Sequence, residues 1–270
     1  MTMTRSVLAG LLVSVMLPAQ AVDASAPKLA EYEKLVADWT AAQKASQAAL
    51  KELVATEEYK AAVAAKDNKK ITELRASVAA DSKPLGARAI ALADQHKGDV
   101  SLQVLAYAAK NFGDADTANG VAERIEKNHL KDAALAQLLE NAGGLSRGLG
   151  PDATNKLLDR VIATSPHALP KAWAMFSQAQ MLLGVTNKKD ASDADKAAAA
   201  EKAARLLKAA EPLAAGNALA DRVVPMLFEA EHLQIGMAVP DIVGEDVDGV
   251  AFKLSDYRGK VVVLDYWGFW

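Results

Sequence analysis

The sequence predicts a mainly α-helical protein in which helical hairpin repeats are followed by a short β portion. Three observations carry this prediction. The stretch from Pro27 to Leu233 is rich in Ala, with Leu, Glu, Lys and Gln at helical spacing and few β-branched runs. Within it, turn-forming segments recur at intervals of about 34 residues. After Leu233 the period of the apolar residues changes from 3.6 to 2, which indicates a domain boundary.

Composition limits the classes of protein and partner. The 270 residues are 51% hydrophobic and 24% charged, the balance of a globular protein. A net charge of −3 and a pI near 5.9 provide no basic field for phosphate backbones, so we expect no nucleic-acid partner. The sequence contains no cysteine, which excludes a disulfide framework and any thiol chemistry performed by these residues alone.

The N-terminal residues 1–21 have the three-part pattern of a secretory signal peptide. Arg5 supplies a positive charge, an apolar stretch runs from Ser6 to Leu17, and Ala19-Gln20-Ala21 offers small residues for cleavage. The apolar stretch is short for a membrane-spanning helix, which needs about 20 residues. We therefore expect export to the periplasm with cleavage after Ala21, and membrane association only if the segment stays uncleaved.

Residues 27–83 are expected to form an N-terminal helical hairpin. The first helix places one apolar face along its length. Glu57 to Ala80 continues as a second helical stretch, with a break predicted near Asp67-Asn68, and is expected to pack antiparallel to the first. The apolar face of the first helix consists of Tyr32, Leu35, Val36, Trp39, Ala42, Ala49, Leu50 and Leu53.

Residues 84–234 are expected to form a helical repeat domain of tetratricopeptide-like period. Turn segments recur around His96, His129 and His167, which lie 33 and 38 residues apart. Such hairpins cover their apolar faces only by stacking on one another. The apolar positions, among them Leu102, Leu105, Tyr107, Phe112, Trp173, Phe176, Met181 and Leu182, are therefore assigned to a core. A groove that binds a protein partner on these repeats is the alternative.

Two polar or flexible segments interrupt the repeats. The insert 187–195 (NKKDASDAD) is polar and charged, which is typical of a loop. The glycine-rich segment 143–150 has neither the GxxxxGK[ST] pattern nor a preceding strand, so it is not a phosphate-binding loop. We expect it to be a linker between hairpins.

The remaining candidates for chemistry favour structural roles. No two of the four histidines lie three or four residues apart, and His near a helix C-terminus is favoured by the helix dipole. Ser146 and Ser177 lack a G-x-S-x-G context. Paired carboxylates such as Glu57-Glu58 fall on solvated helix faces. The sequence thus predicts no metal site and no cofactor.

Residues 235–270 form the C-terminal β portion. Asp248-Gly249 predicts a two-residue type I′ hairpin turn. Ser255 is expected to cap a short turn that ends at Gly259. The run Val261 to Leu264 predicts a central strand covered on both faces. Asp265, directly after this run, is either partly buried with a raised proton affinity or a strand-end residue bonded to backbone amides.

These C-terminal motifs resemble the opening of a thioredoxin-like redoxin domain of the TlpA/ResA type, in the AhpC/TSA superfamily. Gly236, Pro240 and Asp241 match the family's first motif, residues 254–260 match its L-[ST]-D-x-[KR]-G-K turn, and residues 261–267 match its first core strand. The family continues W-[AG]-x-W-C-x-x-C. Trp267-Gly268-Phe269-Trp270 therefore aligns with the four residues before the nucleophilic cysteine.

The resemblance implies an exported thiol-disulfide oxidoreductase of the disulfide reductase type, acting on a protein disulfide with a thiol electron donor. Asp265 would match the acid that accepts a proton during release, and Trp270 would pack beside the nucleophile. Because the 270 residues hold no cysteine, we expect them to be inactive as given and the redoxin domain to be truncated just before its Cys-x-x-Cys. The alternatives are a helical protein-binding module, an inactive fragment, and a peroxiredoxin-like antioxidant.

Overall fold

The computed structural model describes residues 29–186, 188, 190–233, 237–265 and 267–268, so the predicted signal peptide lies outside the described residues. Within these ranges the protein is mainly helical, with twelve α-helices and one two-stranded sheet. Its helices are α1 (Ala30–Ala55), α2 (Glu57–Ala64), α3 (Asn68–Ser77), α4 (Lys83–Asp94), α5 (Gly98–Asn111), α6 (Ala115–Arg124), the π-helix η1 (Ile125–His129), α7 (Leu135–Leu139), α8 (Ala142–Leu149), α9 (Pro151–Thr164), α10 (Ala168–Thr186), α11 (Asp193–Ala214), α12 (Ala220–His232) and the 3₁₀-helix η2 (Leu254–Tyr257). Its strands are β1 (Val243–Glu245) and β2 (Ala251–Lys253).

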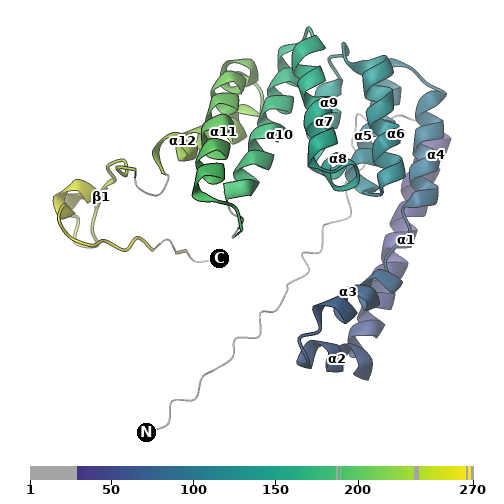
Figure 1. Cartoon of the computed structure of the whole chain (residues 1–270), viewed down its shortest axis with the longest axis horizontal. Coiled ribbons are helices and arrows are strands. Elements are labelled where there is room, and N and C mark those ends of the chain that lie inside the picture. Colours follow the sequence, from purple (N-terminus) through teal and green to yellow (C-terminus); the bar gives the residue numbers. More distant parts are fainter. Residues whose placement is uncertain (1–28, 187, 189, 234–236, 266, 269–270) are drawn as a thin grey trace.

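The helices from α4 to α12 stand side by side as one array (Figure 1). The long helix α1 begins beside α4 and α5 and projects away from the array, carrying α2 and α3 at its far end (Figure 1). The sheet and η2 lie beyond α12, at the opposite end (Figure 1). The C-terminal segment therefore stands apart from the helical body.

Capping side chains determine where several helices begin. Asp67, Asp114 and Ser192 each accept a hydrogen bond from the backbone amide three residues later, at the starts of α3, α6 and α11. Pro84 and Pro151 lie in the first turns of α4 and α9, where a missing amide hydrogen costs nothing. The predicted break near Asp67-Asn68 is thus confirmed, with Asp67 as the cap of α3.

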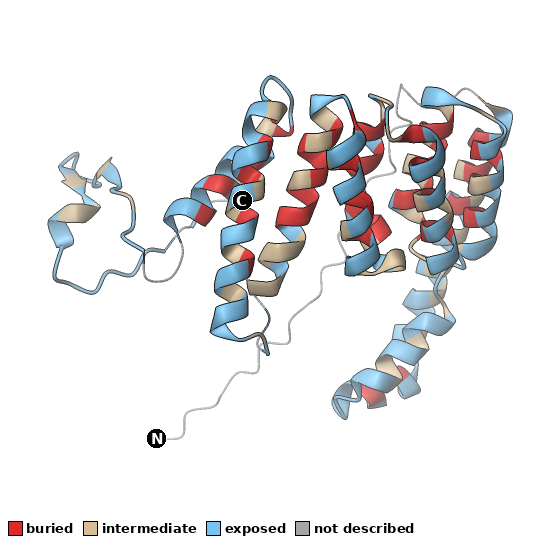
Figure 2. Ribbon diagram, turned by 45° about the horizontal axis from the view of Figure 1, so that its top comes forward, coloured by how far each residue is buried: buried red, intermediate tan, exposed pale blue. Residues whose placement is uncertain are grey.

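One continuous hydrophobic core runs through the array, from Tyr32 in α1 to Ala230 in α12. Trp39 and Phe112 pack edge to face at 5.2 Å, and Phe112 packs on Tyr107 at 5.8 Å. The buried residues lie along the facing sides of the helices, while the C-terminal elements are exposed or half-buried (Figure 2). Tyr32, Leu35 and Trp39 belong to this core, so the first half of α1 packs with the array.

The predicted hairpin between Glu57 and Ala80 folds back on α1. The Ser46 hydroxyl donates a hydrogen bond to the carbonyl of Val78 at 2.7 Å, so the chain after α3 returns to the middle of α1. Arg75 donates to the Tyr59 hydroxyl and joins α3 to α2. The division into domains at residues 83 and 234 and the tetratricopeptide-like period stay predictions.

The glycine-rich segment 143–150 is a helix, so the prediction of a linker was wrong. In α8 a Cβ added to Gly144 would lie 1.8 Å from the carbonyl oxygen of Ala109, and one added to Gly148 would lie 2.4 Å from the Cβ of Ala118. The glycines therefore let α8 approach α5 and α6 closely. Their lack of a side chain serves helix packing here rather than backbone flexibility.

The turn predictions were mostly confirmed. Gly98 and Gly216 have φ of 57° and 75° at the α4–α5 and α11–α12 turns, and residues 165–167 separate α9 from α10. His129 is the exception, because it lies buried in η1 and the chain turns only after Leu130. Among the described residues, no helix is long and apolar enough to cross a membrane.

Candidate functional site

The C-terminal segment, residues 237–268, carries the motifs that point to chemistry. Its strands β1 and β2 pair antiparallel, with Val243 opposite Lys253, Gly244 opposite Phe252 and Glu245 opposite Ala251. Val243 and Lys253 therefore share one face of the hairpin, and Gly244 and Phe252 share the other. Phe252 is half-buried on its face, whereas Val243 is exposed.

The hairpin forms, but its turn is longer than predicted. The amide of Asp246 donates to the carbonyl of Val250, and Gly249 donates to the carbonyl of Asp246 and has φ of 77°. The Asp246 carboxylate also accepts the amides of Asp248 and Val250, each at 2.9 Å. The connection is thus a three-residue loop with a left-handed glycine, and the two-residue type I′ prediction was wrong because the Asp246 side chain organises a wider turn.

Asp241 joins the beginning of the segment to its helical turn. Its two carboxylate oxygens accept hydrogen bonds from the amide and the hydroxyl of Ser255, both at 2.8 Å. The Ser255 hydroxyl, followed by the Ser255 amide, holds the pKa of the Asp241 carboxyl below its usual value. Ser255 therefore binds Asp241 instead of capping the turn.

Asp256 performs the capping that was assigned to Ser255. Its carboxylate accepts the amide of Lys253 at 2.9 Å, at the start of η2. Gly259, with φ of 85°, ends the turn as predicted. Lys260 lies with its ammonium 5.8 Å from the centre of the Tyr257 ring. The L-S-D-Y-R-G-K motif thus folds as one compact turn whose polar side chains bond to its own backbone.

The predicted central strand does not form in the structure. Residues 261–265 have no assigned strand, and Val261 and Val263 are 97% and 87% exposed. A strand covered on both faces needs pairing and packing elements, and β1 and β2 are the only strands in the described part of the chain.

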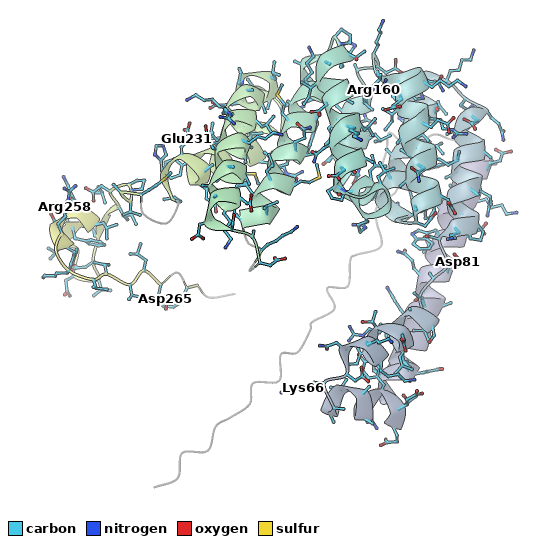
Figure 3. The ribbon with its side chains drawn as sticks, in the orientation of Figure 1. Lys66, Asp81, Arg160, Glu231, Arg258 and Asp265 are labelled. Atoms are coloured by element: carbon cyan, nitrogen blue, oxygen red, sulfur yellow. The ribbon has the colours of Figure 1, made fainter. Side chains whose placement is uncertain are left out.

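Asp265 lies on the same extended trace beyond the hairpin (Figure 3). It is exposed, which agrees with neither the burial nor the backbone bonding expected for it. Trp270, the second predicted site residue, lies outside the described residues. The catalytic roles assigned to both residues therefore stay predictions.

A constellation that the sequence did not reveal lies in the helical array. The Ser101 hydroxyl is 3.2 Å from Nε2 of His129, and Nδ1 of His129 is 2.8 Å from a carboxylate oxygen of Asp132. This order resembles a serine hydrolase triad. Ser101 and His129 are each only 3% exposed, so no substrate reaches the hydroxyl. The three side chains instead fasten α5 to the chain that follows η1.

An open depression of about 460 Å³ lies between the end of α10 and the start of α11. Leu182 and Val185 form part of its wall, and Lys188, Asp190 and Lys202 surround it. The charges are of both signs and do not converge on one point. In the described parts of the chain, no group of three or more potential ligands is placed to hold a metal ion.

Comparison with known proteins relates a short stretch of the chain to a redox family. It is 45% identical over 42 residues to the thiol-disulfide oxidoreductase ResA of Geobacillus kaustophilus, and 43% identical over 42 residues to that of Geobacillus thermodenitrificans. ResA of Bacillus anthracis is 40% identical over the same length. Each match covers 16% of this chain and 24% of the relative.

The chain thus spans about a quarter of the length of the curated relatives it matches. No family model matches the sequence, and no solved structure matches it. The similarity is that of a thioredoxin-like redoxin relationship over one short stretch, within a protein that is otherwise mainly helical.

Proposed function

We propose that the whole protein is an exported thiol-disulfide oxidoreductase of the disulfide reductase type, and that residues 235–270 begin its redoxin domain. The observation that carries the proposal is the similarity to ResA proteins at 40 to 45% identity. We assign the matched stretch to the C-terminal segment, because the ordered motifs of that family occur there.

The local structure of the segment supports this assignment. Asp241, Asp256 and Gly259 belong to the motifs of the resemblance, and each has a backbone or capping role in one compact turn. The turn delivers the chain directly to Val261, where the redoxin family has its first core strand. Motif residues that organise their own turn argue against a chance match in composition.

The proposed chemistry transfers two electrons. A thiolate attacks one sulfur of the substrate disulfide, forming a mixed disulfide and releasing the other substrate sulfur as a thiolate. The second cysteine then displaces the remaining substrate sulfur. The substrate leaves as a dithiol and the enzyme becomes a disulfide, which an external thiol donor reduces. The 270 residues contain no cysteine, so both thiols belong to a Cys-x-x-Cys pair that the proposal places directly after Trp270.

Two residues of this chain would assist that chemistry. Asp265 would take up a proton when the second cysteine becomes the attacking thiolate. This role needs Asp265 to be partly buried beneath the cysteines, where desolvation raises the pKa of a carboxyl. Trp270 would shield the nucleophile from water. The N-terminal pattern in residues 1–21 supports export and a periplasmic site of action.

The direct test is to read the coding sequence beyond the codon for Trp270 and to express the protein through that region. We expect an in-frame Cys-x-x-Cys at once after Trp270, and reduction of a protein disulfide by the extended protein with a thiol donor. The 270-residue chain is the matched control, and it should show no reduction because it has no thiol.

Replacing either cysteine of the extended protein by Ser should abolish turnover. A single cysteine after a Pro-containing segment would instead support the peroxiredoxin-like alternative, with peroxide as the substrate. The absence of any Cys-x-x-Cys in the reading frame would contradict the proposal.

A further inference from the structure

Large exposed hydrophobic side chains are confined to the two ends of the molecule. Among the described residues between Val63 and Val224, no large hydrophobic side chain is classed as exposed. One exposed group lies on the arm formed by α1 and α2. The other begins on α12 and continues into the C-terminal segment, with Val224, Phe228, Leu233, Met237, Val239, Ile242 and Val243. The second group therefore divides between two surfaces that adjoin in sequence.

The first of these surfaces is the outer face of α12. Val223, Leu227 and Ala230 of this helix are buried in the core of the array. Val224 and Phe228 lie one turn apart and are 48% and 46% exposed. In a stacked helical array each helix covers the apolar face of its neighbour, and α12 is the last helix of the array. Its outer face is therefore an apolar surface without a helix packed on it.

The second surface is the stretch Met237 to Val243, in which Met237, Val239 and Val243 are 47%, 53% and 68% exposed. Asp241 within it is bonded to Ser255, so the stretch is attached to the hairpin. It follows α12 after a connection of only a few residues. Such a short tether gives the two surfaces a high effective concentration for each other.

The connection is long enough for the two surfaces to meet. The ten residues from Leu233 to Val243 can span about 33 Å when extended. Val224 lies about 14 Å back along the axis of α12 from Leu233, at 1.5 Å per residue. The stretch can therefore turn back and reach the whole exposed face.

Charge also matches across the two surfaces. Asp221 lies one helical turn before Val224, on the same side of α12. Lys253 is the cross-strand partner of Val243 and shares its face of the hairpin. A contact between Val243 and Val224 would bring the ammonium of Lys253 toward the carboxylate of Asp221.

We propose that residues 237–243 fold back along α12, so that Met237, Val239 and Val243 cover Val224 and Phe228. The helical array then holds the C-terminal segment in a fixed orientation against its last helix. This inference concerns an interaction surface and does not depend on the redox proposal.

The absence of cysteine from the sequence allows a clean test by disulfide trapping in the 270-residue chain. The test pair is Val224→Cys with Val243→Cys. The control pair is Val224→Cys with Val247→Cys, because Val247 lies at the hairpin tip and is fully exposed. Under mild oxidation at low protein concentration, we expect the test pair to form an intramolecular disulfide about tenfold faster than the control pair.

Adding Phe228→Ala to the test pair should reduce its rate toward that of the control, since the apolar contact is weakened. Equal rates for the two pairs would overturn the proposal. Disulfides between two chains would also overturn it, because they would assign the face of α12 to a second copy.

Hydrogen exchange on the cysteine-free chain gives an independent readout. The amides of residues 237–243 should exchange more slowly in the unmodified chain than in a Phe228→Asp variant. Phe228 is exposed, so the variant should keep the fold of the array. Identical exchange in the two proteins would contradict docking, whatever the behaviour of the cysteine variants.

Discussion

Two short apolar runs in this protein have opposite fates. In α7, Leu135, Leu138 and Leu139 are each 0% exposed, whereas the four residues from Val261 to Leu264 are between 42% and 97% exposed. Both runs are hydrophobic enough to be core. The first is enclosed by helices from elsewhere in the array, and the second lies beyond the last helix (Figure 2). Hydrophobic sequence therefore sets the capacity for burial, and the surrounding elements determine whether burial occurs.

The largest effect should come from removing a core aromatic ring. Phe112 is 1% exposed and packs on the rings of Trp39 and Tyr107. We expect Phe112→Ala to lower the free energy of unfolding by about 3–5 kcal/mol. Val263→Ala, the matched deletion in the exposed run, should change it by less than about 0.5 kcal/mol. Urea unfolding measures both, and similar losses for the two variants would refute the contrast.

A smaller effect is expected from one methyl group in α8. Gly144→Ala would place a Cβ 1.8 Å from a backbone oxygen, so the helices must separate, at a cost of about 1–3 kcal/mol. Gly143→Ala meets nothing within 4 Å and should instead stabilise the protein by about 0.5–1 kcal/mol. Thermal unfolding of the two variants should give shifts of opposite sign. Shifts of the same sign would show that α8 is not held against α5.

The cap of α6 should make stability depend on pH. Burial raises the pKa of Asp114, but hydrogen bonds from the amide and hydroxyl of Thr117 and from Ser82 outweigh it and hold this pKa below its usual value. A depressed carboxyl pKa contributes stability that is present above the unfolded-state pKa, near 3.9, and is lost as the pH falls through the folded-state pKa.

Asp114→Asn should therefore flatten the loss of stability below about pH 4. At neutral pH the substitution should cost at most about 1 kcal/mol, because asparagine is also a good N-cap. Unfolding measured at several pH values tests both expectations. An unchanged acid slope in the variant would contradict the assignment to Asp114.

The smallest global effect should come from the C-terminal turn. Asp241→Asn weakens the two hydrogen bonds to Ser255, so the amide of Ser255 should exchange faster. The free energy of unfolding of the array should stay unchanged, because Asp241 lies outside the core. A Ser255→Ala variant is the matched control, since it removes only the hydroxyl. A global loss of stability in either variant would mean that the segment packs on the array more tightly than the structure indicates.

The helical region could be predicted from its sequence because the information is local. Spacing placed Trp39, Leu102, Leu105 and Phe112 on buried faces, and all four are buried. Asp67 marked the break between α2 and α3 through its own side-chain bond. Capping and periodicity act within a few residues of the chain, which is the range that a sequence pattern reports.

The errors arose where distant residues decide the conformation. Gly144 suggested a linker, and only the proximity of Ala109 explains its place in a helix. Val261 to Leu264 suggested a buried strand, but pairing and cover must come from other elements. Asp246 changed the turn at Asp248-Gly249 by binding two amides, a detail that the two-residue signal did not contain. Buried Ser101 and His129 were missed because 28 residues separate them.

The contrast between the array and the exposed run is tested most directly by hydrogen exchange across the 270-residue chain. The account predicts slow exchange, limited by global unfolding, for buried helices such as α5, α9 and α10. It predicts exchange close to the unprotected rate for Val261 to Leu264. Protection of that run equal to the protection of α10 would contradict the account, because it would require a strand with partners that the structure does not show.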